Sequence, residues 1–117
     1  MQIQVNTDRN VEGTQAFEEE VRTMIARTLD RFSERVTRIE AHVSDSNSGA
    51  KGGGADIRCV LEARLAGMNP ISVRHQAATP EQAVAGATEK LEKMLQRTHD
   101  RLNRTRGRTS VGGAEVD

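Results

Sequence analysis

Four stretches of the chain alternate between apolar and polar residues, which is the pattern of a β-strand with one buried face. They cover residues 1–6, a stretch that begins at Thr37, residues 55–66 and residues 71–77. In the second stretch the expected core-facing residues are Thr37, Ile39, Ala41 and Val43. The other face of each strand is polar, so we expect a four-stranded sheet with one apolar and one polar face.

Two further stretches repeat their apolar residues every three or four positions, as amphipathic helices do. The first covers about residues 15–33 and follows Thr14, a side chain suited to capping a helix. The second opens with residues 79–82 (TPEQ), which combine a capping threonine, a proline in the first helical position and a capping-box glutamine. We expect this helix to reach about Thr105.

The order of these elements is β-α-β-β-β-α. It predicts an α+β fold of two layers, a four-stranded sheet with two helices on one face, because both helices must cover the single apolar face. Residues 46–54 (SNSGAKGGG) lack the spacing of a phosphate-binding loop and precede a strand, so we interpret them as a hairpin connection. The chain of 117 residues fits one domain, which we place at residues 1–105, followed by a flexible tail at 106–117.

Composition narrows the class of protein. Apolar residues make up 35% of the chain, an ordinary share for a globular domain, and none of the apolar runs is long enough to span a bilayer. The first ten residues lack the pattern of a secretory signal. With no membrane partner expected and one cysteine, which cannot form an internal disulfide, we expect a cytoplasmic protein.

The residues that usually carry catalysis are few and scattered. His42, His75 and His99 have no spacing typical of metal ligands, and Cys59 falls on the core-facing side of its strand. None of the serines has the surroundings of a nucleophile. We therefore expect no enzyme, no metal, no cofactor and no small-molecule substrate.

Charge is distributed unevenly although the formal net charge is zero. Residues 1–50 carry 6 Lys/Arg and 9 Asp/Glu (−3), whereas residues 51–117 carry 11 and 8 (+3). Six bases of the second helix, spaced by three or four residues, fall within about 80° of one another on a helical wheel. These residues, called the basic row below, are Lys90, Lys93, Arg97, Arg101, Arg104 and Arg108.

The basic row has two interpretations. Bases often form a solvated helix face, but such a face usually mixes signs to gain pairs between residues i and i+4. Here Glu89, Glu92 and Asp100 lie on a separate side of the helix. This separation of positive from negative charge favours a polyanion as the partner of the basic row. Because the chain has no Trp or Tyr and its two phenylalanines fall on a core face, base stacking is disfavoured, and we expect recognition of the backbone and shape of structured RNA.

Four segments resemble the ribosome hibernation-promoting factor family of bacteria, in its short form, the ribosome-associated translation inhibitors. They are MQIQV at residues 1–5, RFSERVTRIEAHVSDSN at 31–47, RCVLEARLAGMNPISV at 58–73 and EKLEKMLQRTHDRL at 89–102. The fourth segment resembles the closing helix of the family. Its bases that match the recurrent family bases are Lys90, Lys93, Arg97 and Arg101.

The resemblance implies the same β-α-β-β-β-α fold and a ribosomal partner. It implies that the protein binds ribosomal RNA of the small ribosomal subunit near the decoding region, and silences translation reversibly under stress. The additional C-terminal domain with which long members pair two ribosomes is not expected here.

The residues also allow an alternative of another class, a protein–protein interaction through the polar face of the sheet. Mixed charges there suit a protein partner better than RNA. The residues concerned are Arg38, His42, Arg58, Glu62, Arg64 and Arg74.

Overall fold

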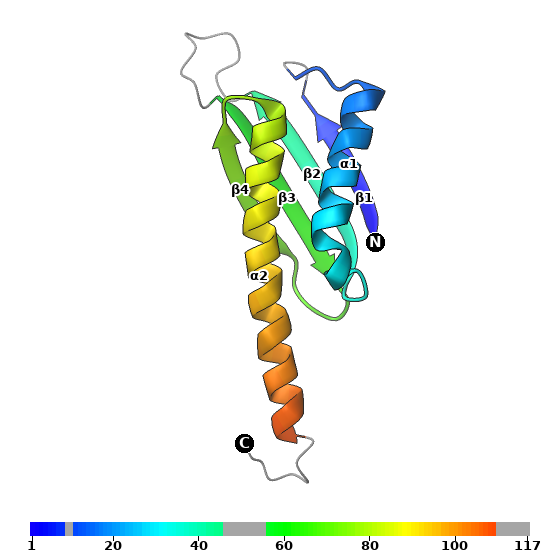
Figure 1. Ribbon diagram of the computed structural model, residues 1–117, viewed down its shortest axis with the longest axis vertical. Coiled ribbons are helices and arrows are strands. Elements are labelled where there is room, and N and C mark those ends of the chain that lie inside the picture. Colours follow the sequence, from blue (N-terminus) through cyan, green and yellow to red (C-terminus); the bar gives the residue numbers. More distant parts are fainter. Residues whose placement is uncertain (9–10, 46–55, 110–117) are drawn as a thin grey trace.

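The computed structural model describes residues 1–8, 11–45 and 56–109, with side chains of the last segment as far as Arg104. A six-residue strand opens the fold and a thirty-residue helix closes it (Figure 1). The elements are β1 (Gln2–Thr7), α1 (Gln15–Leu29), the short 3-10 helix η1 (Asp30–Phe32), β2 (Val36–Asp45), β3 (Ile57–Leu65), β4 (Ile71–Ala77) and α2 (Pro80–Thr109).

The four strands form one sheet in the order β1-β2-β3-β4. β1 runs parallel to β2, while the β2–β3 and β3–β4 pairs are antiparallel. Both helices lie on the same face of this sheet (Figure 1). The expected two-layer α+β fold is thereby confirmed, and β1 and β4 are left as the two edge strands.

The hydrophobic core fills the space between the sheet and the two helices. β3 shows the alternation most clearly, because every second residue from Ile57 to Leu65 is buried. Thr88 is a buried polar residue of α2, and its hydroxyl donates to the carbonyl oxygen of Val84 at 2.7 Å, so it enters the core with its hydrogen bond satisfied.

Both predicted helix caps are present. The hydroxyl oxygen of Thr14 accepts a hydrogen bond from the backbone N–H of Phe17 at 3.0 Å, and that of Thr79 accepts one from the N–H of Gln82 at 3.1 Å. Each cap satisfies one of the N–H groups that have no partner inside the helix, which fixes where the helix starts.

The expected core position of Thr37 is wrong. The register of the β2–β3 pair shifts between Val36 and Arg38. Val36 therefore takes the buried position, while Thr37 is exposed and its hydroxyl donates to the carbonyl oxygen of Arg64 at 3.1 Å. A bulge of this kind moves the pleat by one residue, and strict alternation cannot anticipate it.

The helix boundaries also differ from the expectation. α1 ends at Leu29 and η1 continues to Phe32, so residues 15–33 are not one α-helix. α2 continues four residues past Thr105, to Thr109. Gly107 does not end it, because one glycine costs a helix only about 1 kcal/mol relative to alanine. The expected hairpin connection at 46–54 and residues 110–117 of the expected tail lie outside the described residues.

Candidate nucleic-acid interface

α2 has an apolar side and a basic side, as its sequence predicts. Its core-facing residues include Val84, Ala87, Leu91, Leu95 and Thr98, all of them buried. The members of the basic row whose side chains are described are all exposed, and they are Lys90, Lys93, Arg97, Arg101 and Arg104. Arg108 belongs to the helix, but its side chain lies outside the described part.

The basic row forms a long, narrow band of positive charge. Fourteen residues separate Lys90 from Arg104, so at the rise of a helix the band is about 21 Å long. Successive members lie about 5–6 Å apart, as residues three or four apart on a helix do. Lys93, Arg97 and Arg104 form no ion pair with any residue that the structure describes.

Contacts of two members of the row, Lys90 and Arg101, locate it on the β4 side of the molecule. The ammonium group of Lys90 donates a hydrogen bond of 2.9 Å to the carbonyl oxygen of Arg74 in β4. Arg101 borders a hollow formed with the turn between β3 and β4, which includes Gly67 and Pro70. The row thus follows the side of α2 that faces the free edge of the sheet.

The acidic side of α2 makes its contacts elsewhere, with the segment that joins α1 to β2. Glu92 forms an ion pair with Arg31 at 3.3 Å, and Asn103 accepts a hydrogen bond from Arg35 at 3.4 Å. The Arg31 guanidinium also lies 4.6 Å from the centroid of the Phe32 ring, a cation–π contact. One acid and one amide on this side of α2 therefore contact arginines of the segment between α1 and β2. Sequence patterns could not reveal the contacts of Glu92 and Asn103, because these join residues more than sixty positions apart.

A glycine brings α2 close to β4. A Cβ atom on Gly86 would lie 2.1 Å from Cδ2 of the His75 ring, far inside contact distance. The half-buried imidazole of His75 therefore occupies the space that any other residue at position 86 would fill. His75 is thus a packing residue of β4, and the sequence pattern did not reveal the role of Gly86.

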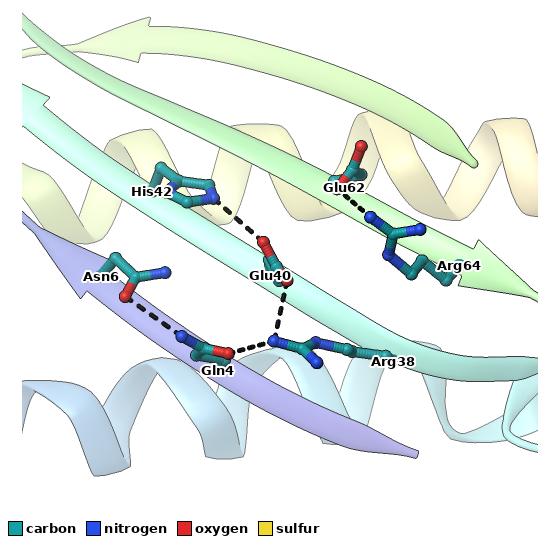
Figure 2. A network of polar contacts seen from close by, with 7 residues as sticks. All are labelled: Gln4, Asn6, Arg38, Glu40, His42, Glu62 and Arg64. Carbon is teal, nitrogen blue, oxygen red and sulfur yellow. Dashed lines mark hydrogen bonds and ion pairs between the residues drawn. The ribbon is translucent and has the colours of Figure 1, made fainter.

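The open face of the sheet carries charges of both signs, and several of them pair with one another (Figure 2). Glu40 contacts Arg38 at 2.8 Å and His42 at 3.4 Å, and Glu62 contacts Arg64 at 3.6 Å. Across the strands like charges are opposed, since Arg38 is paired in register with Arg64 and Glu40 with Glu62. Opposed like charges destabilise a sheet, and the contacts along each strand offset this.

The structure also describes the surroundings of the single cysteine and of the possible metal ligands. Cys59 is fully buried, and this burial raises the pKa of its thiol to about 12, so the thiol remains protonated near neutral pH. Within the described ranges, His, Cys, Asp and Glu side chains form no group of three that could hold a metal ion. Among the same residues, the helices are all too short or too polar to cross a membrane.

Comparison with protein families identifies the chain. Residues 4–103 match the family described as sigma 54 modulation protein / S30EA ribosomal protein. The chain belongs to this family. Its members are ribosome-associated factors, so the resemblance inferred from the four sequence segments is confirmed.

Two solved structures are similar in fold. The N-terminal domain of Thermus thermophilus protein Y aligns with a TM-score of 0.66 and 24% identity, over 84% of this chain and 99% of that one. A ribosomal subunit interface protein from Coxiella burnetii aligns with a TM-score of 0.63 and 16% identity, over 86% and 99%. A comparison with curated proteins found no match.

The extent of the family match divides the basic row. Lys90, Lys93, Arg97 and Arg101 lie within the residues that match the S30EA family, whereas Arg104 and Arg108 lie beyond residue 103. The first four are also the bases that resemble recurrent bases of the family's closing helix. Both the sequence resemblance and the family match therefore include these four residues.

Proposed function

We propose that this protein binds ribosomal RNA of the small subunit near the decoding region, and that it thereby silences translation reversibly under stress. The basic row carries the proposal. Five exposed bases on one side of α2 repel one another, and a row of backbone phosphates would relieve that repulsion while releasing counterions. The position near the decoding region comes from the family resemblance alone.

The mode of binding follows from what the surface offers. Arginine and lysine contact phosphate oxygens without reading the bases, so the row fixes position on folded RNA rather than sequence. Phe17 and Phe32 are both buried, and the chain has no Trp or Tyr, so its aromatic side chains offer no platform for stacked bases.

The direct test is charge reversal in the middle of the row. The triple variant Lys93→Glu, Arg97→Glu and Arg101→Glu should lose co-sedimentation with small subunits, because attraction to phosphate becomes repulsion. All three side chains are exposed, so the circular dichroism spectrum and the thermal midpoint should stay close to wild type. Unchanged co-sedimentation of a folded triple variant would overturn the proposal.

A protein partner on the open sheet face predicts a different outcome. If that face bound a ribosomal protein, nuclease digestion of the RNA would leave a partner bound, and neutralising Arg38 and Arg64 would release it. The internal pairing of these two arginines with Glu40 and Glu62 reduces the charge that they offer to a partner. We therefore favour RNA on α2.

A further inference from the structure

A second basic feature lies beside the row, at the free edge of β4. It is a hollow of about 410 Å³ lined by Arg58, Arg74, His75, Gln76 and Lys90. Three of the five lining side chains carry a positive charge, and none is acidic. β4 is the last strand of the sheet, so the hollow opens at an unpaired strand edge.

Three elements bring the charges of this hollow together. Arg58 comes from β3, Arg74 from β4 and Lys90 from α2. The hydrogen bond from the Lys90 ammonium to the Arg74 carbonyl oxygen, 2.9 Å long, holds this cation against the strand edge. Packing of the His75 ring on Gly86 keeps α2 close enough to β4 for that contact.

The arginines of the hollow differ from the other arginines of the sheet. The guanidiniums of Arg38 and Arg64 each contact a glutamate of their own strand. Arg58 and Arg74 form no ion pair with any described residue, and the buried Nε of Arg58 has no hydrogen-bond partner among them. The Nε of Arg38 also has no partner, but its terminal nitrogen bonds to both Glu40 and Gln4.

We propose that this hollow binds one backbone phosphate of the ribosomal RNA, so that the RNA interface extends from α2 around the free edge of β4. Guanidinium groups match the geometry of phosphate oxygens, and an ammonium group adds a point charge. Lys90 belongs to both the row and the hollow, which makes the two basic surfaces continuous. The proposal rests on the proposed function, because it takes RNA as the partner.

A matched pair of variants tests the hollow. Arg58→Gln with Arg74→Gln removes two charges from it, and Arg38→Gln with Arg64→Gln removes two charges from the same sheet face outside it. The first variant should bind small subunits at least several-fold more weakly. Its log affinity should also decrease less steeply with log salt, by about one unit of slope for the lost phosphate contact. The second should keep the wild-type slope.

The outcomes separate this proposal from the proposed function. If the α2 triple reversal abolishes binding while the Arg58/Arg74 variant keeps wild-type affinity and slope, the hollow is not part of the interface and the proposed function stands. If the triple reversal leaves binding intact, the proposed function itself fails.

A titration with inorganic phosphate distinguishes RNA from a free anion. Weak shifts of the Gln76 and His75 amide signals in NMR spectra, together with the affinity loss above, would support an RNA phosphate. Saturable phosphate binding by the hollow, with unchanged subunit affinity of the Arg58/Arg74 variant, would overturn the assignment, because the hollow would then serve a free anion.

Discussion

The basic row of α2 and the open face of the sheet use the same kinds of charged residue, and they present them differently. On the sheet Arg38 and Arg64 each contact a glutamate of their own strand. On α2 the acids lie on another side of the helix, and Lys93 and Arg97 have no ion-pair partner among the described residues. The two surfaces thus differ in how their charges are sorted rather than in the kinds of charged residue that they carry, and under the proposed function this sorting suits α2 to a polyanion.

The periods of the two elements produce this difference. In a strand, residues two apart share a face. Glu40 therefore lies between Arg38 and His42 on one face of β2 and contacts both of them. In a helix, residues three or four apart share a side, so bases at those spacings collect on one side and acids at other spacings collect elsewhere. Glu92 and Asn103 then contact Arg31 and Arg35 of the segment that joins α1 to β2.

The largest expected effect comes from disturbing the packing of α2 on the sheet. The basic row has a fixed position only while the opposite side of the helix is packed. Gly86→Ala places a Cβ atom against the His75 ring. Overpacking costs about 1–3 kcal/mol and exceeds the roughly 1 kcal/mol that alanine gains in a helix. We expect a lower free energy of unfolding, by up to about 2 kcal/mol, measured by urea denaturation.

The His75→Ala background provides the control for this variant. Without the imidazole the clash is gone, so Gly86→Ala should raise the free energy of unfolding by about 1 kcal/mol through helix propensity alone. Equal effects of Gly86→Ala in both backgrounds would contradict the packing described here.

A smaller effect should follow from removing the acids of the sheet face. Glu40→Gln with Glu62→Gln should change the free energy of unfolding by less than about 1 kcal/mol, because ion pairs on a solvated surface contribute little and the change also removes the opposed charges of Glu40 and Glu62. The variant should nevertheless bind a non-cognate RNA more tightly at low salt, since Arg38 and Arg64 then lack their partners. Filter binding with single-stranded polyuridine measures this.

Glu19→Gln with Glu20→Gln changes the net charge equally, at exposed positions of α1, and serves as the control. If both variants raise RNA affinity by the same factor, net charge alone is responsible, and the ion pairs of Arg38 and Arg64 do not weaken RNA binding by the sheet face.

Much of the fold could be predicted because its determinants are local. The alternation of β3, the threonine caps of both helices and the apolar side of α2 all depend on residues within a few positions of one another. The basic row was predictable for the same reason, since one helix carries all of it.

What could not be predicted depends on contacts between distant segments. The bulge that exposes Thr37 arises from pairing between β2 and β3, and the packing of His75 on Gly86 joins β4 to α2. The hollow at the β4 edge combines Arg58, Arg74 and Lys90 from three elements. A sequence read one element at a time assigns the two arginines to a mixed sheet face and the lysine to a helix.

The most direct test of the central claim compares salt dependence between two matched double variants. Lys93→Gln with Arg97→Gln removes two charges from the row, and Arg38→Gln with Arg64→Gln removes two from the sheet face. Affinity for small subunits falls as salt rises. For the row variant this fall should be shallower by about two units of log affinity per log salt, and for the sheet variant it should match wild type. Equal slopes for both variants and wild type would contradict the account.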